Sequence, residues 1–223
     1  MANIAENIKL LQSTLPANVS LVAVSKFHPV DALMQAYNAG QRVFGESRAQ
    51  ELVQKASAMP SDVEWHFIGH LQTNKLKMVV PLVKMIHRID SEKLLIAVNE
   101  EATKVNKIVN VLLEVHVAQE ETKFGFSEAE CHEIAESGLL DSLKNVRVCG
   151  VMGMATNTND EDEIRVEFMK IHSIFKALKK GVMAQCEWFK EISMGMSDDW
   201  HIAIDEGSTM VRIGSSIFGV REY

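Results

Sequence analysis

Cysteine is scarce in this sequence of 223 residues, with only Cys131, Cys149 and Cys186, and no two of them are spaced as C-x-x-C. Cysteines that are odd in number and far apart argue against a disulfide framework and against a zinc site. They are typical of a protein that stays reduced, so we expect a cytoplasmic location.

Long apolar runs and targeting signals are also missing. No run approaches the roughly 20 residues of a membrane helix. The first residues, M-A-N-I-A-E-N-I-K-L-L, lack the basic and apolar regions of a signal peptide. We therefore expect no membrane contact.

Positive charge is the third deficit: 23 basic residues stand against 30 acidic ones, for a net charge of −7. No cluster of lysine and arginine offsets this balance, which excludes nucleic acid as an expected partner. The content of 47% hydrophobic and 24% charged residues is that of an ordinary globular protein.

The run V-S-L-V-A-V-S-K-F at residues 19–27 is apolar on both alternating faces and ends in Lys26. Apolar residues of both parities are typical of a strand covered on both sides, as in a parallel sheet. A lysine there must reach water, meet a partner or lose its charge. Lys26 is therefore a candidate imine-forming nucleophile, and the alternative is a lysine that simply extends into solvent.

Strands and helices are expected to alternate along the whole chain. The expected strands cover residues 19–27, 42–47, 63–70, 85–89, 107–117, 146–155, 187–194 and 209–218. The expected helices cover residues 4–15, 28–38, 48–58, 73–81, 91–105, 127–138, 160–180 and 198–206. We expect Ser47, Ser91 and Ser127 to act as N-caps, the last in a capping box with Glu130.

Such alternation predicts parallel strands with right-handed crossovers. Either an open doubly wound sheet or a closed (β/α)8 barrel would satisfy it, and eight strands favour the barrel. The expected fold is thus an α/β protein with one TIM barrel domain over residues 1–223 and an extra N-terminal helix.

In a barrel, function gathers at the carboxyl ends of the strands. Candidate residues there include Glu46, Asp90 and Lys123. Two further candidates are segments rich in glycine and serine, S-M-G-M-S-D at 193–198 and R-I-G-S-S at 212–216. Backbone N–H groups in such loops bind anions, and barrel closure would place them beside Lys26. A lysine beside a phosphate site suggests pyridoxal 5′-phosphate held as a Schiff base; the alternative is that these glycines only form turns.

Arg212 refines this hypothesis, because a guanidinium only donates hydrogen bonds. If Arg212 faces the pyridine nitrogen, the ring nitrogen stays unprotonated and the ring is a poor electron sink. The alternative is that Arg212 pairs with a carboxylate such as Glu46 or Asp90.

His66 and His70 share one face of the third expected strand. Two histidines without a third ligand are a weak metal signal, so buried, hydrogen-bonded histidines are the favoured interpretation. His70 lies at the strand's end, where it could contact a ligand. Met152 or Met154, in G-V-M-G-M-A-T, could lie against a flat ring.

Five segments resemble the pyridoxal phosphate homeostasis proteins, the YggS/PROSC group, over essentially the whole chain. They are A-V-S-K at 23–26, F-G-E-S-R-A-Q-E at 44–51, W-H-F-I-G-H-L-Q-T-N-K at 65–75, S-M-G-M-S-D-D at 193–199 and V-R-I-G-S-S-I-F-G at 211–219.

This resemblance implies a barrel similar to the N-terminal domain of alanine racemase, with pyridoxal phosphate on Lys26. It also implies that the phosphate meets Ser197, Gly214 and Ser215, that Arg212 faces the pyridine nitrogen, and that the protein buffers and delivers the cofactor. The cofactor-binding candidates are Lys26, Ser47, His70, Met154, Ser197, Arg212, Gly214 and Ser215.

Two departures from the family and its racemase relatives matter. Ser47 stands where the family more often has asparagine, which puts any ring contact of that residue in doubt. The racemase's tyrosine base has no obvious counterpart, because the only tyrosines are Tyr37 and Tyr223; Lys123 stands where the racemase has an arginine.

Two functions remain open from the sequence. The first is a monomeric carrier that gives the cofactor to apo pyridoxal phosphate enzymes. The second is a weak amino-acid racemase, or a related enzyme, that uses Lys26 as its acid and base. Racemisation requires two placed acid/base groups, so the sequence favours the carrier.

Overall fold

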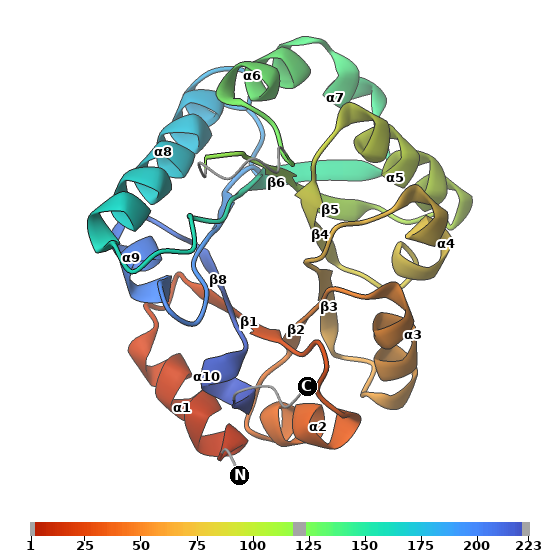
Figure 1. Cartoon of the computed structure of the whole chain (residues 1–223). Coiled ribbons are helices and arrows are strands. Elements are labelled where there is room, and N and C mark those ends of the chain that lie inside the picture. The colour runs from red at the N-terminus through yellow and green to blue at the C-terminus, as the bar shows by residue number, and fades with distance from the viewer. Residues whose placement is uncertain (1–2, 118–123, 220–223) are drawn as a thin grey trace.

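The computed structural model describes residues 3–117 and 124–219, and eight parallel strands in these residues close into a barrel in sequence order (Figure 1). Closure comes from the pairing of the first strand with the last, with Ser20 opposite Met210 and Ala23 opposite Ile213. The prediction of a closed (β/α)8 barrel is confirmed, and the open sheet is excluded.

The strands are β1 (Ser20–Val24), β2 (Val43–Glu46), β3 (Glu64–Phe67), β4 (Met85–Ile89), β5 (Val109–Glu114), β6 (Val146–Met152), β7 (Glu191–Ser193) and β8 (Met210–Ile213). The helices are α1 (Ile4–Thr14), α2 (Val30–Asn38), α3 (Ala49–Ala58), α4 (Leu76–Val79), α5 (Glu92–Lys104), α6 (Glu128–Glu136), α7 (Leu139–Ser142), α8 (Glu161–Lys180), α9 (Trp200–Asp205) and α10 (Ser215–Phe218). A 3-10 turn, η1 (Thr73–Lys75), precedes α4.

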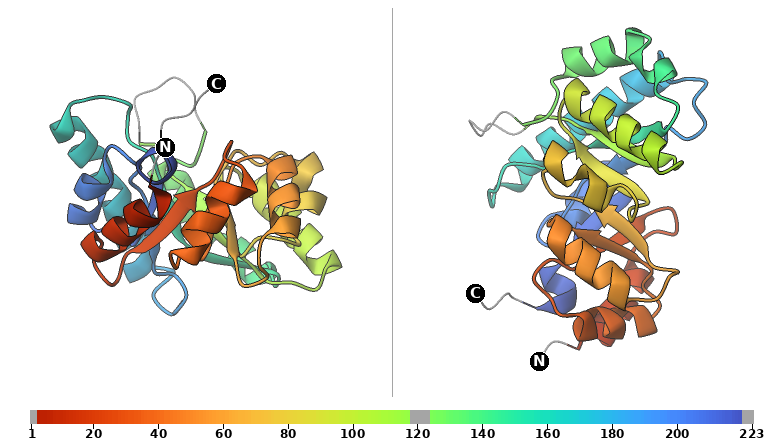
Figure 2. Two further views of the ribbon diagram at one scale, coloured as in Figure 1. Left: turned by 90° about the horizontal axis from the view of Figure 1, so that it is seen from below. Right: turned by 90° about the vertical axis from the view of Figure 1, so that its right-hand side faces the viewer.

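Several predicted boundaries are confirmed by side-chain caps. The Ser91 hydroxyl accepts from the backbone N–H of Leu94, and Ser127 and Glu130 form the expected capping box. The extra N-terminal helix is present as α1, which lies beside α10, where the Asn7 side chain donates to the Ile217 carbonyl at 3.0 Å (Figure 1). Seen from the side, α1 and α2 cover the same side of the barrel (Figure 2, left).

Three local predictions are wrong, and one helix was missed. Ser47 is not the N-cap of α3, because Arg48 occupies that position and no side chain caps the helix. Residues 215–218 form α10 instead of extending the last strand, and α7 was not expected at all. The seventh strand starts only at Glu191, because hydrogen-bonded turns occupy residues 181–189.

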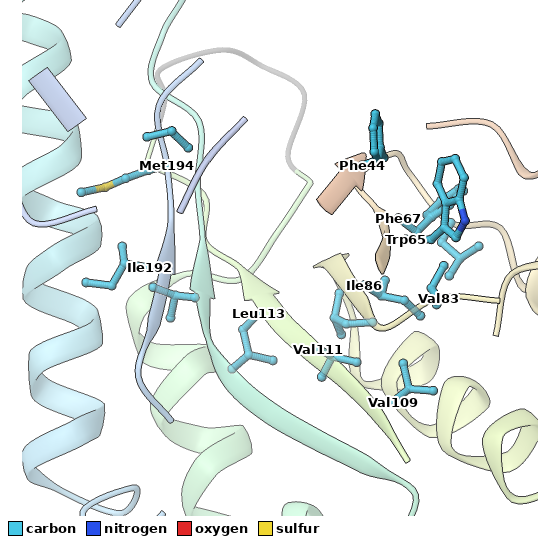
Figure 3. Packing of buried hydrophobic residues seen from close by; sticks show 14 of the residues in the cluster. Phe44, Trp65, Phe67, Val83, Ile86, Val109, Val111, Leu113, Ile192 and Met194 are labelled. Atoms are coloured by element: carbon cyan, nitrogen blue, oxygen red, sulfur yellow. The ribbon is translucent and has the colours of Figure 1, made fainter. Parts of the chain in front are cut away.

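Side chains of the strands divide into two layers. Those facing outward, such as Phe44, Trp65 and Phe67, pack against the helices in the large core (Figure 3). Those facing inward form a small apolar cluster within the barrel: Val22, Met85, Leu112, Cys149, Met152 and Met210. The alternation of β8 therefore sends Val211 and Ile213 outward and Arg212 inward.

No helix in the described parts of the chain is long and apolar enough to span a bilayer.

Candidate functional site

One cavity of about 570 Å³ opens at the carboxyl ends of the strands. The segments that follow β1, β2, β3, β6, β7 and β8 all contribute to its wall, as expected for a barrel. The structure brings all eight cofactor-binding candidates to this cavity: Lys26, Ser47, His70, Met154, Ser197, Arg212, Gly214 and Ser215.

Lys26 lies in a turn two residues beyond the end of β1 and is partly buried. The following residue, Phe27, has a φ of +69°. This left-handed conformation is uncommon outside glycine and marks a backbone held by its surroundings. The expected strand thus ends earlier than its apolar pattern indicates, and the lysine stands at the rim rather than within the sheet.

The loops after β7 and β8 meet on one side of the cavity. The backbone N–H of Gly214 donates to the Ser197 hydroxyl at 3.2 Å, which joins the two loops. Within the described residues, the N–H groups of Ser215 and Ser216 donate to no acceptor. N–H groups and hydroxyls that converge in this way suit an anion.

Arg212 is almost fully buried, at 5% exposure, and its guanidinium is held from below. One amino group donates to the carbonyl and the hydroxyl of Ser193 at 2.8 and 2.6 Å, and the other donates to the Gly153 carbonyl at 3.1 Å. Burial lowers the pKa of Arg212 to about 10, so it remains charged at neutral pH. Three of its roughly five N–H groups are therefore engaged, and the rest remain for a ligand in the cavity that it lines.

The two carboxylates considered as partners of Arg212 are paired elsewhere. Glu46 accepts from Lys55 at 2.6 Å, and Asp90 lies 3.1 Å from His70. The proposed ion pair of Arg212 with either carboxylate is therefore wrong.

Below Arg212, two histidines continue the polar contacts into the barrel. His87 Nδ1 lies 3.0 Å from the Ser193 hydroxyl, and His87 Nε2 lies 2.9 Å from His66 Nδ1. Burial lowers the pKa of His66 to about 3, and burial together with His66 and Arg212 lowers the pKa of His87 well below its usual value. Both rings are therefore neutral at pH 7. The interpretation of the predicted histidines as buried and hydrogen-bonded is confirmed for His66 and wrong for His70, whose side chain is 46% exposed.

The donors and acceptors in this series of hydrogen bonds follow from Arg212. Because the guanidinium only donates, the Ser193 hydroxyl accepts from it and can donate its own hydrogen bond to His87 Nδ1. His87 then carries its proton on Nε2 and donates to His66 Nδ1. Ser193 and the two neutral histidines thus form a relay of hydrogen bonds, all pointing away from Arg212, that holds its guanidinium in place.

The rim of the cavity is built from smaller contributions. Ser47 lies so close to Gly69 that a Cβ on that glycine would stand 2.3 Å from the Ser47 carbonyl oxygen. Met154 lines the cavity, whereas Met152 belongs to the apolar cluster inside the barrel. Of the two methionines considered for a flat ring, the structure thus places only Met154 at the cavity.

Sequence reasoning missed several cavity residues. Arg88, the most informative, forms a double ion pair with Glu114, with N···O distances of 3.0 and 2.7 Å. It also lines a second cavity of about 250 Å³ that shares Met154 and Met196 with the first. The register shift between β4 and β5 at Ile86–Ile89 breaks the alternation that would have assigned Arg88 a face. The other missed residues are Val24, Phe27, Arg48, Ile68 and Gly69, whereas Met196 and Asp198 belong to the predicted segment at 193–198.

Two predicted features lie outside the described residues, namely Lys123 and Tyr223. Tyr37, the other tyrosine, lies in α2 and donates its hydroxyl proton to Asp62 at 2.7 Å. No tyrosine is therefore among the described residues that line the cavity.

The fold and the rim site define a barrel of the alanine racemase N-terminal type. The family described as "Alanine racemase, N-terminal domain" matches residues 1–222. The chain is 39% identical to the pyridoxal phosphate homeostasis protein of Vibrio alginolyticus, with 100% of both chains covered. It is also 39% identical to the protein of that name from Schizosaccharomyces pombe, covering 96% of this chain and 89% of the relative.

Solved structures agree with this assignment. PipY of Synechococcus elongatus PCC7942, solved with PLP bound, is 35% identical, with a TM-score of 0.87 over 97% of this chain and 100% of that one. Alanine racemase from E. faecalis, at 20% identity and a TM-score of 0.71, shares the fold over 58% of its length. The chain belongs to the alanine racemase N-terminal domain family, and within it to the pyridoxal phosphate homeostasis proteins.

Proposed function

We propose that this protein binds pyridoxal 5′-phosphate as a Schiff base on Lys26 and maintains the supply of the cofactor. The observation that carries the proposal is one cavity that joins Lys26, the buried guanidinium of Arg212 and the joined loops of Ser197 and Gly214. Full-length relatives named for pyridoxal phosphate homeostasis, and a structural neighbour solved with PLP, support it.

The residues present fit this cofactor at both of its ends. The unused N–H group of Ser215, with the Ser197 hydroxyl that joins the loop at Gly214, suits the phosphate. Arg212 suits an unprotonated pyridine nitrogen, and Met154, Ser47 and His70 would border the ring. The cofactor supplies an aldehyde, which condenses with a lysine amine with loss of water.

The proposed contact between Arg212 and the pyridine nitrogen supports a carrier role. A charged donor opposite the pyridine nitrogen keeps that nitrogen unprotonated, which weakens the ring as an electron sink. The two faces of a racemase site also need two acid/base groups, and the described cavity wall contains no tyrosine. We infer that the protein retains and releases the cofactor rather than turning over amino acids at a high rate.

The finer points of this role are also proposals. We infer that the whole chain, residues 1–223, is one cofactor-binding domain, and that it acts as a monomer in the cytoplasm. Its protein partners would be apo pyridoxal phosphate enzymes that accept the cofactor.

Transfer to an apoenzyme tests the carrier role. Loaded protein is mixed with an apo pyridoxal phosphate enzyme, and the recovery of that enzyme's activity is followed. The control contains free pyridoxal 5′-phosphate instead, at the concentration that the loaded protein releases on its own. We expect faster recovery with the loaded protein, and no such gain from Lys26→Ala incubated with the same cofactor. Recovery no faster than free release would contradict delivery.

The alternative is a weak racemase or related enzyme, and one observation favours it. His70 lines the same cavity as Lys26 and is paired with Asp90 at 3.1 Å, which supplies a second titratable group. Exchange of the α-hydrogen of amino acids for deuterium, lost in both Lys26→Ala and His70→Gln, would establish this function. Absence of exchange above that of free cofactor would exclude it.

A further inference from the structure

A buried ionic network lies behind the rim, between the barrel wall and α3. Lys55, on α3, is only 6% exposed and donates to the Glu46 carboxylate at 2.6 Å and to the Glu51 carboxylate at 2.9 Å. The Ser25 hydroxyl donates to the same Glu46 oxygen at 2.6 Å. Buried charges of this kind are expensive and persist where they serve a purpose or are fully paired.

The network is not built for stability alone, because it is incompletely paired. Glu46 is fully buried, and its second carboxylate oxygen has no hydrogen-bond partner. Burial raises the pKa of Glu46, against the hydrogen bond from Lys55. Apolar side chains at positions 46 and 55 would avoid the cost of burying two charges. The role of this network is therefore to be sought in the other contacts of Lys55 and Glu51.

Those contacts hold the backbone on both sides of Lys26. The Lys55 ammonium donates to the carbonyl of Ser25, the residue before Lys26, at 2.8 Å. The Glu51 carboxylate accepts from the backbone N–H of Phe27, the residue after Lys26, at 2.8 Å. Glu51 and Lys55 are themselves joined, so one unit fixes both ends of the turn.

The turn needs such a restraint. Phe27 adopts a φ of +69°, a left-handed conformation that is strained for residues other than glycine. The Arg48 guanidinium stacks on the Phe27 ring at 4.3 Å and lies 3.8 Å from Glu51, which adds a second contact on the solvent side. Without these contacts the turn would relax, and Lys26 would lose its place in the cavity wall.

We propose that Glu51 and Lys55 are positioning residues for Lys26: together they hold the strained turn whose geometry aims the lysine amine at the cavity. The inference rests on the proposed function, since it concerns how fast Lys26 forms the Schiff base. In that step the amine nitrogen bonds to the aldehyde carbon, and the aldehyde oxygen departs as water.

Glu51→Ala tests the acceptor for Phe27, and Glu51→Gln should rescue it, because an amide oxygen also accepts from N–H. The apo protein is mixed with pyridoxal 5′-phosphate, and Schiff-base absorbance is followed by stopped flow. We expect Glu51→Ala to slow formation by about tenfold, the scale of a small misplacement of a reacting group, and Glu51→Gln to recover most of the loss. Gln54→Ala, an exposed change on the same helix, should leave the rate unchanged.

A second readout does not involve the cofactor. The Phe27 amide hydrogen should exchange with solvent faster in Glu51→Ala than in the wild type, while amides of β1 keep their rates. For Lys55, the paired change Lys55→Met with Glu46→Gln removes the Ser25 contact without leaving a buried charge alone. It should slow Schiff-base formation in the same way.

The outcomes separate this inference from the proposed function. If the wild type forms the Schiff base on Lys26 and Glu51→Ala forms it at the same rate, the positioning role is wrong and the proposed function stands. If Glu51→Gln is as slow as Glu51→Ala, the hydrogen bond to Phe27 is not the cause, and the inference is also wrong. If the wild type forms no Schiff base on Lys26, both fall.

Discussion

Among single side chains, Arg212 shows how a buried charge is given one orientation. Ser193 accepts from it through two oxygens, and His87 and His66 continue the contact inward. Because all of these groups are buried, removal of one partner leaves another unsatisfied.

Ser193→Ala should therefore affect both stability and the site. It removes one acceptor of Arg212 and the hydroxyl that faces His87, so we expect a loss of about 1–3 kcal/mol in the free energy of unfolding. Cofactor affinity, measured by fluorescence titration, should fall as well. Unchanged affinity in a stably folded variant would show that the relay does not orient Arg212.

Arg212→Glu tests the ring contact itself. An acceptor or acid in place of a charged donor should change the protonation of the pyridine nitrogen and shift the visible absorption of the bound cofactor. The measurement is the spectrum of the loaded variant against the wild type at one pH. An unchanged spectrum with cofactor bound would place Arg212 away from the ring.

Among the elements, the loops after β7 and β8 depend on glycine geometry. Gly195 has a φ of +94°, and a Cβ there would stand 2.6 Å from the Cβ of Ala203. The loop that carries Ser197 therefore cannot keep its course with a larger residue at this position.

Gly195→Ala should lower both the melting temperature and the cofactor affinity, with a loss of more than about 1 kcal/mol in stability. Gly138→Ala is the matched control, since Gly138 also has a positive φ, +76°, but faces open space at the start of α7. The control should lose stability only and keep its affinity for pyridoxal 5′-phosphate. Equal affinity in the two variants would mean that the β7 loop does not shape the site.

The sequence predicts most of these elements because apolar periodicity and caps are local signals. It does not predict α10, because the apolar residues of V-R-I-G-S-S-I-F-G favour one continuous strand. Only the structure shows that the chain turns at Gly214 and begins a helix. The positioning pair is equally hidden: Glu51 and Lys55 are spaced i, i+4 on a helix, a pattern typical of a solvent-exposed ion pair. Only the tertiary structure shows that Lys55 is buried and reaches the Ser25 carbonyl.

For the barrel as a whole, the eight site candidates were predictable because parallel strands bring their carboxyl ends to one rim. Arg88 was not predictable, because a register shift, which no single-sequence pattern reveals, sets its direction.

The histidines in the barrel interior also make the stability of the whole molecule depend on pH. His66 and His87 have folded-state pKa values below the usual value for histidine, about 3 in the case of His66. The unfolded chain therefore binds protons that the folded protein does not, and stability falls as pH drops below about 6.5. Between pH 7 and pH 5, we expect His66 alone to account for about 2 kcal/mol of lost stability. Urea unfolding of the wild type and of His66→Gln at both pH values checks this; equal losses in the two proteins would contradict it.

We propose that one amine at the barrel rim, that of Lys26, holds the cofactor. Borohydride reduction of the loaded protein, followed by peptide mass mapping, tests it most directly, with Lys26→Ala as the control. We expect a single phosphopyridoxyl adduct on the peptide that contains Lys26, absent from the variant. An adduct on another lysine, or none on a protein that binds the cofactor, would contradict it.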